Sequence, residues 1–171
     1  MDNPKHPFWD WSLDAYGRPG VEEILLDLQD RHGLDVNLLL FACWFGATGR
    51  GRLSNGMWTD LIGATADWRA TVIEPLRAVR RQLKGQDDMP GAAMLRQGVK
   101  ALELDAERAA QLAIAGLTPN LSDMEVATAT RIADASANLE DCVAASGKTS
   151  FPGHRKLLAS LARSVCVSAP T

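Results

Sequence analysis

The segment from Val36 to Gly46, VNLLLFACWFG, constrains the fold of this 171-residue chain more than any other stretch. It is apolar on almost every side, so a helix built from it has no polar face to turn towards water. With about 11 residues it is too short to span a bilayer, which takes about 20. Asp35, directly before it, is a typical N-cap residue, because its carboxylate accepts from the free N–H groups of a first helical turn. We therefore expect a buried central helix and no membrane association.

The rest of the chain also favours helices. Ala and Leu are its commonest residues, and both lose little side-chain freedom in a helix. No stretch of useful length alternates between apolar and polar residues, as a half-buried strand would. We predict an all-α fold in which residues 1–171 form a single-domain bundle of about six to eight helices. The first half is rich in aromatic residues and the second in Ala, so any sub-division would fall near residues 85–90.

Composition excludes several classes of function. The formal net charge of −3 gives no global electrostatic footprint for nucleic acid, so a nucleic-acid partner is not expected. The three cysteines, Cys43, Cys142 and Cys166, form no CxxC pair, which argues against a disulfide framework or a cysteine zinc site. The first residues, MDNPKHPFWDW, contain no apolar signal-peptide core. We expect reduced thiols, a cytoplasmic location, and neither a metal ion nor a cofactor.

The stretch FWDWSLDAYGRPGVEEILLDLQDRHGLDVNLLLFACWFG resembles the signature of an uncharacterised family of short proteobacterial proteins. The resemblance rests on Phe-Trp-x-Trp-Ser at the start and on an Asp-Val-Asn-Leu-Leu-Leu-Phe pattern that here reads Asp35 to Phe41. WRATVIEPLRAVRRQLK, further along, is also similar to the family's pattern. The resemblance covers about the first half of the chain. It implies a bacterial cytoplasmic lineage, but it carries no activity and no catalytic residues.

One candidate site is a polar cluster between residues 29 and 37. Arg31, His32, Asp35 and Asn37 bring a guanidinium, an imidazole, a carboxylate and an amide into one helix–turn–helix. A histidine beside a core with a carboxylate in reach can act as an acid or a base. The simpler interpretation is structural: Asp35 caps, Arg31 pairs at the surface, and Asn37 bonds a neighbouring segment. Because a buried amide without partners costs about 1–3 kcal/mol, Asn37 needs such a bond in either case.

A second candidate is the helix predicted from Trp68 to Lys84. Arg69, Arg77, Arg80, Arg81 and Lys84 fall on one side of it, opposite an apolar stripe that includes Trp68. Such a face can bind an acidic partner, a phosphate or RNA, or it can simply be solvated. Pro75 lies inside this helix and removes a backbone hydrogen bond, so we expect a kink near Thr71 or two helices that meet there.

The tryptophans give a third signal, since all five lie in the first 68 residues. Trp44 and Trp68 fit ordinary core positions. Trp9 and Trp11 are two residues apart on a short predicted helix and point in different directions. At least one of them should face solvent or cover a second surface, such as a partner or a pocket.

These signals rank three functions. A protein–protein interaction module, binding a partner or itself, comes first, because Trp and Arg are enriched at binding hot spots and no coherent catalytic set is present. A small-molecule-binding protein or enzyme, using the cluster around His32, Asp35 and Asn37, comes second. Binding of RNA or an acidic ligand through residues 69–84 comes third. The sequence leaves open whether the protein is an enzyme.

Overall fold

A computed structural model describes residues 6–86, 88–118, 123–148 and 153–167. All regular secondary structure in these ranges is helical, which confirms the predicted all-α class. No helix in the described ranges joins enough length to enough hydrophobicity to cross a bilayer. The elements are α1 (Pro7–Tyr16), α2 (Val21–His32), α3 (Val36–Ala47), α4 (Asn55–Trp68), the π-helical turn η1 (Arg69–Ile73), α5 (Glu74–Gln82), α6 (Ala92–Gly116), α7 (Thr128–Ala145) and α8 (His154–Cys166).

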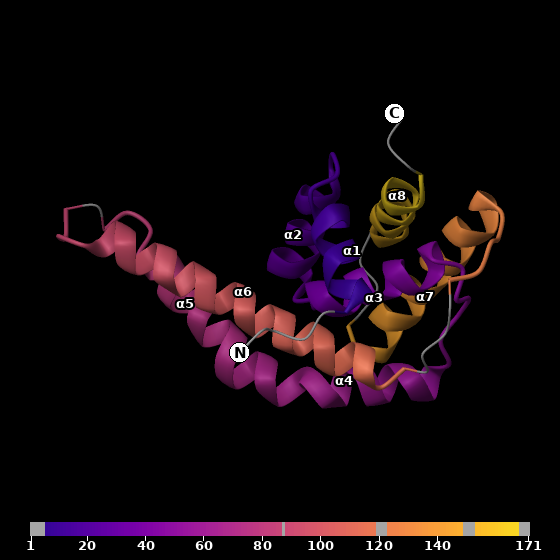
Figure 1. Cartoon of the computed structure of the whole chain (residues 1–171), viewed down its shortest axis with the longest axis horizontal. Coiled ribbons are helices and arrows are strands. Elements are labelled where there is room, and N and C mark those ends of the chain that lie inside the picture. Colours follow the sequence, from indigo (N-terminus) through magenta and orange to yellow (C-terminus); the bar gives the residue numbers. More distant parts are fainter. Residues whose placement is uncertain (1–5, 87, 119–122, 149–152, 168–171) are drawn as a thin grey trace.

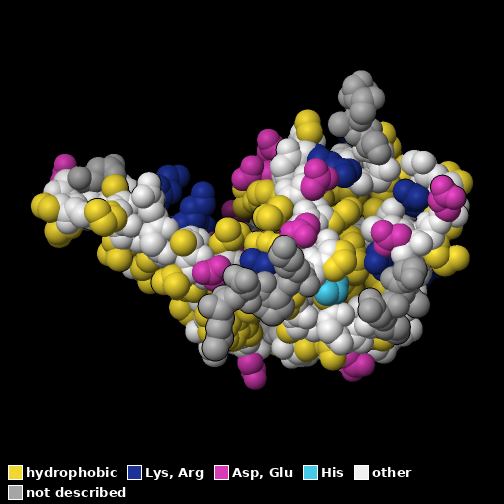
Figure 2. All heavy atoms as spheres, viewed as in Figure 1, with side chains coloured by type: hydrophobic (Ala, Val, Ile, Leu, Met, Phe, Trp, Pro, Cys, Tyr) yellow, Lys and Arg dark blue, Asp and Glu magenta, His cyan; other side chains and the backbone are white. Residues whose placement is uncertain are grey.

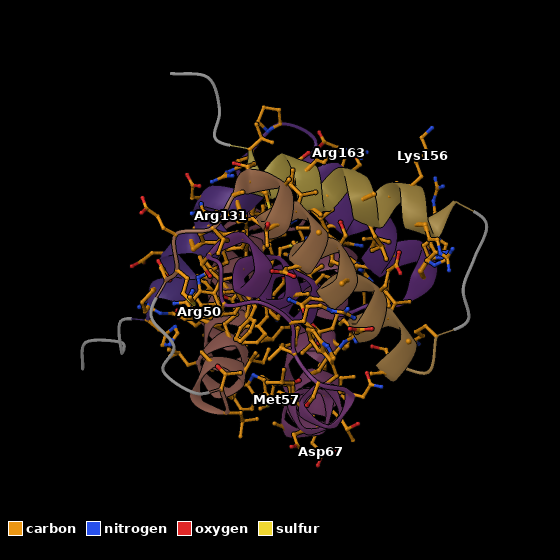
Figure 3. All side chains as sticks on the ribbon, turned by 90° about the vertical axis from the view of Figure 1, so that its right-hand side faces the viewer. Arg50, Met57, Asp67, Arg131, Lys156 and Arg163 are labelled. Carbon is orange, nitrogen blue, oxygen red and sulfur yellow. The ribbon has the colours of Figure 1, made fainter. Side chains whose placement is uncertain are left out.

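Helix α3 is the centre of the bundle, as its composition predicts. Every residue from Val36 to Ala47 is buried, and α1, α2, α6, α7 and α8 all pack against the helix. The Asp35 carboxylate caps it by accepting from the backbone N–H of Asn37 at 2.9 Å. Charged side chains such as Lys156 and Asp67 lie at the periphery of this body (Figure 3).

Helices α3 and α7 make the most extensive contact between two helices of the body. A Cβ atom placed on Gly46 would lie 2.3 Å from the backbone nitrogen of Ala135, so only glycine permits this approach. The same helix, α7, also holds the loop that follows α3. The side-chain amide of Asn138 accepts from the N–H of Leu53 at 3.0 Å and donates to the carbonyl of Gly51 at 2.9 Å. Residues far apart in sequence thus fix the glycine-rich loop to the core.

Residues 55–82 form one almost continuous helical rod. The predicted start of a new helix at Trp68 is wrong, because α4 runs through this residue into η1. The predicted irregularity near Thr71 is confirmed as a π turn, in which the N–H of Glu74 bonds to the carbonyl of Arg69. The wider turn falls where the ring of Pro75 would otherwise press on the carbonyl of Thr71. The chain therefore absorbs the proline without ending the helix.

Helices α5 and α6 form an antiparallel hairpin that projects from the body (Figure 1). We call α5, the turn after it and the N-terminal half of α6, residues 74–104, the arm. The C-terminal half of α6 continues into the body, where it packs against α1, α3 and α4. Residues 85, 86 and 88–90, near the change in composition, lie at the tip of the arm.

Candidate functional site

A chain of buried polar side chains joins α1, α3 and α6 inside the body. The Nε2 group of Gln111 donates to Oδ1 of Asn37 at 3.0 Å, and the hydroxyl of Ser12 donates to Oε1 of Gln111 at 3.0 Å. The Nδ2 group of Asn37 donates to a carboxylate oxygen of Glu107. Asn37, Gln111 and Ser12 are all buried. Each polar atom thus finds a partner on another helix, which offsets the cost of removing it from water.

The chain continues from Glu107 into the arm through ion pairs. Arg77 is only 6% exposed, and its guanidinium donates to the Glu107 carboxylate, with Glu103 at 3.6 Å. Arg80 donates to both carboxylate oxygens of Glu103, one of them at 3.1 Å. We call Ser12, Asn37, Arg77, Arg80, Glu103, Glu107 and Gln111 the polar network. It begins on α1 in the body and ends at the root of the arm.

Burial governs the electrostatics of the network. It raises the pKa of Glu107 above its ordinary value, although the Arg77 charge and the Asn37 amide oppose the shift. The half-buried Tyr16 has its pKa raised to about 12, first by burial and then by the neighbouring Glu22. The phenol is therefore neutral at ordinary pH and does not act as a base.

The structure separates the residues of the predicted polar cluster. Arg31 is exposed and pairs with Asp27 on its own helix at 3.0 Å, whereas Asn37 points into the polar network. Asp35 caps α3 and lies 3.7 Å from Arg69. His32 is the last residue of α2 and is half-buried. Three of the four groups thus have the structural roles of pairing, capping and linking helices.

The basic face of residues 69–84 is only partly turned towards the protein: Arg77 is buried and Arg69 and Arg80 are half-buried, whereas Arg81 and Lys84 are exposed. Besides the network ion pairs, Arg69 contacts Glu74 at 3.3 Å, and Arg81 reaches Asp30 on α2 at 3.1 Å.

Val79, on the opposite side of α5, is exposed. The prediction of an apolar side turned inwards and a basic side turned outwards is therefore wrong for Arg77 and Val79, because the carboxylates of α6 pair with Arg77 and part of the apolar side stays uncovered. Other residues of the apolar side, Val72 and Leu76, do pack against a small core formed by η1 and α6.

Sequence reasoning assigned no site role to Glu103, Glu107, Gln111 and Ser12. A signal for two of them is present: Glu103 and Glu107 stand four residues apart on one helix face, while Arg77 and Arg80 stand three apart on the preceding helix. In an antiparallel hairpin such complementary spacings place the charges opposite each other. Gln111 and Ser12 had no such signal, because their partners come from helices that are distant in sequence.

The tryptophans differ from expectation as well. Trp9 is buried, with the Arg108 guanidinium 5.3 Å from its ring, and Trp11 is half-buried against the main core. Trp11 is the less covered of the two, so the prediction that one of them covers a second surface stays a prediction. Trp44 is buried as predicted. Trp68 is 41% exposed, which corrects its assignment to the core, and its indole N–H donates to the carbonyl of Ala106 at 2.9 Å.

The described residues contain no group of three or more His, Cys, Asp or Glu side chains that would hold a metal ion. The three thiols are buried or half-buried, and burial raises the pKa of each, that of Cys142 to about 12 and that of Cys166 to about 11. Neutral buried thiols are poor nucleophiles and poor ligands.

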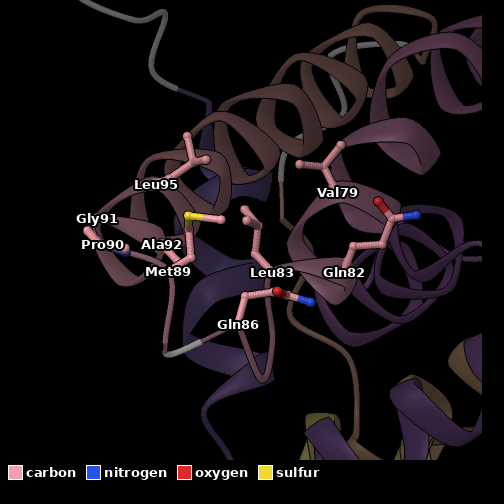
Figure 4. Close-up of a pocket in the computed structure, with 9 residues that line it drawn as sticks. All are labelled: Val79, Gln82, Leu83, Gln86, Met89, Pro90, Gly91, Ala92 and Leu95. Atoms are coloured by element: carbon pink, nitrogen blue, oxygen red, sulfur yellow. The ribbon is translucent and has the colours of Figure 1, made fainter.

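The arm carries two adjoining apolar hollows. One, of 430 Å³, lies between α5 and α6 near the tip, where Val79 and Leu83 face Met89 and Leu95 (Figure 4). The other, of 550 Å³, lies on α6 itself and shares Leu95 with the first. Its lining is Gly91, Met94, Leu95, Gly98, Val99 and Leu102.

The walls of these hollows are open to solvent. Met94 is 78% exposed and Leu102 58%, and Met89 and Leu95 are exposed as well. Figure 2 shows apolar side chains along one edge of the arm, while Lys and Arg side chains gather on the edge that faces α2. We call Val79, Leu83, Met89, Met94, Leu95, Gly98 and Leu102 the apolar face of the arm. A contiguous exposed apolar surface of this kind is a candidate binding site.

Comparison with known proteins identifies the lineage of the chain. A family model described as "Protein of unknown function (DUF2390)" matches residues 7–114, which run from α1 to the C-terminal part of α6 and include both the polar network and the arm. No curated protein and no solved structure matched the chain. Because the matched residues make up more than half of its length, the protein belongs to the DUF2390 family.

Proposed function

We propose that this protein is a non-enzymatic, cytoplasmic interaction module, and that it binds an apolar helical surface of a protein partner through the apolar face of the arm. The observation that carries the proposal is the exposure of Met94, Leu95 and Leu102 side by side on a hairpin that projects from the body. A protein surface supplies enough apolar contact to cover so extended a groove. The polar network supports the same role, since it fixes the root of the arm to the core.

The groove favours a helix as the ligand. At the bottom of the groove Gly98 has no side chain. The walls are flexible or branched apolar side chains, which follow one another at the spacing of successive helical turns. An amphipathic helix that lies in such a groove contributes side chains every three or four residues. Met94 and Met89, which adapt readily to different shapes, suit this mode of binding.

The cytoplasmic part of the proposal is supported by the three thiols, which are free. Proteins of oxidising compartments usually pair their cysteines, and those of reducing compartments do not. The alternative functions have weaker support. The polar cluster residues are engaged in capping and pairing, and the arginines of residues 69–81 contact carboxylates of the same chain.

A photo-crosslinking amino acid at Met94, introduced in the full chain and expressed in cells, tests the proposal. We expect a crosslinked protein whose contacting peptide, identified by mass spectrometry, is an amphipathic helix. The crosslink should be lost in Leu95→Glu, which places a charge in the groove. The same photo-crosslinker at the exposed Asp60 on α4 should not give it. Equal crosslinking from both positions, or none from Met94, would contradict an arm-specific interaction.

A further inference from the structure

The apolar face of the arm has a feature that identifies its occupant. Along α6 the groove residues Gly91, Leu95, Gly98 and Leu102 are separated by four, three and four positions, which keeps them on one stripe of the helix. In side-chain size the order is small, large, small, large. Read backwards, the same order is large, small, large, small. A second α6 that runs antiparallel to the first therefore places a leucine opposite each glycine and a glycine opposite each leucine.

We propose that the occupant is a second copy of this chain, and that two arms pair through antiparallel α6 helices around a two-fold axis between Leu95 and Gly98. This inference rests on the proposed function and names the partner for the same surface. In the pair, Leu95 of each copy packs over Gly98 of the other, and Leu102 packs over Gly91. Every contact occurs twice, as a two-fold interface requires.

The hollows are free to receive these side chains. A Cβ added at Gly98 or Gly91 would meet no heavy atom within 4 Å, so nothing in the same copy fills the space above them. Gly98 also lets the two helix backbones approach closely. The residues that line the stripe carry no charge, and Arg96 and Lys100 fall on other sides of the helix, so two identical faces meet without burying like charges.

The area is also of the right size. Burying the exposed parts of Val79, Met89, Met94, Leu95 and Leu102 removes on the order of 500 Å² of surface per copy. Together with the rim residues, the two copies reach roughly 1,200 Å², the lower end of stable protein interfaces. The structure therefore points to a dimer of moderate affinity that forms and dissociates with concentration.

Sedimentation velocity of the full chain tests the inference. The protein concentration is raised in steps to on the order of 0.5 mM, because interfaces of this small size can be weak. We expect the wild type to change from monomer to dimer, and Leu95→Glu to remain monomeric. Gly98→Met should raise the dissociation constant at least about ten-fold, although it makes the surface more apolar. Gly63→Met, on the exposed face of α4 where an added Cβ also meets nothing, should leave the dissociation constant unchanged.

The outcomes separate this inference from the proposed function. Circular dichroism first verifies that each variant is folded. A wild type that is monomeric throughout, or a Gly98→Met variant that associates as well as or better than the wild type, overturns the two-fold pairing. If the protein is monomeric but the photo-crosslinker at Met94 still captures a different protein, the proposed function stands and only the inference fails. If both experiments fail, neither holds.

Discussion

At the scale of single residues, Asn37 shows how much depends on one polar group in an apolar helix. Its amide donates to Glu107 and accepts from Gln111, so it ties α3 to α6 at two points. The sequence predicts that such an amide must find partners, because leaving it unpaired costs free energy. It does not predict which partners, since they lie 70 and 74 positions away along the chain.

Replacing this amide by an apolar group of similar size should be costly. Asn37→Leu leaves Glu107 and Gln111 buried with one partner fewer each, so we expect the free energy of unfolding to fall by about 1–3 kcal/mol. Urea unfolding followed by circular dichroism measures it. Gln97→Leu, which makes the corresponding change on the exposed surface of α6, is the control and should alter stability by less than about 0.5 kcal/mol. Equal effects of the two substitutions would show that Asn37 has no linking role.

The raised pKa of Glu107 gives stability a specific pH dependence. In the folded protein the carboxyl holds its proton to higher pH than the ordinary value of 4.5, so the folded state binds more protons in the interval above 4.5. The contribution of Glu107 to stability is therefore largest below pH 4.5 and decreases as the pH rises through the folded-state pKa. Glu107→Gln cannot titrate and lacks this decrease.

The measurement is the difference in unfolding free energy between wild type and Glu107→Gln from pH 4 to pH 7. We expect the wild type to lose stability relative to the variant as the pH rises. The exposed Glu125→Gln removes one carboxylate without touching the network and corrects for the change in overall charge. A difference that stays constant, or that grows in favour of the wild type with rising pH, would contradict the raised pKa.

At the scale of elements, the contact of α3 with α7 depends on one glycine. Gly46→Ala places a methyl group against the backbone of Ala135 and must push the two helices apart. We expect a loss of about 1–3 kcal/mol, as for other insertions into a packed core. Gly63→Ala on α4 adds the same methyl group in open space and should stabilise by about 0.5–1 kcal/mol. Chemical denaturation compares the two, and effects of the same sign would rule out the steric explanation.

Helices α4 and α5 show what local sequence patterns predict well and what they do not. Pro75 predicts an irregularity near Thr71, because the constraint acts within one helical turn. It does not predict whether the chain ends the helix or widens it, since that choice depends on what packs around it. Here the exposed indole of Trp68 bonds to Ala106 on α6, and η1 carries the rod on into α5.

At the scale of the whole molecule, the central helix and the all-α class follow from the sequence, but the arm does not. The pattern of residues 69–84 predicts an apolar side turned inwards and a basic side turned out. In the structure Arg77 is buried and Val79 is exposed. Helical periodicity identifies two faces, and the carboxylates on α6 decide which of them is covered. Which residues are covered depends on how the two helices pair, and the periodicity of one helix carries no information about that pairing.

The shape of the molecule predicts a gradient of stability along α6. Residues 106–116 pack in the body, whereas most residues from 93 to 102 are exposed. Amide hydrogens near the tip should therefore exchange at least about ten-fold faster than those at residues 110–115, because local opening there disrupts few contacts. Hydrogen exchange with mass spectrometry at low protein concentration measures this. Uniform protection along α6 would show that the arm unfolds only with the body.

The continuity of α6 has a mechanical consequence. A helix of 25 residues is about 37 Å long, so a single element joins the tip of the arm to the core of the body. The ion pair of Arg77 with Glu107 lies where the helix enters the body. Met94 and Leu95 lie on the helix on one side of this ion pair, towards the tip. Gln111, which is bonded to Asn37, lies on the other side, towards the core. We therefore expect a partner bound at the tip to affect the hydrogen bonds of the central helix.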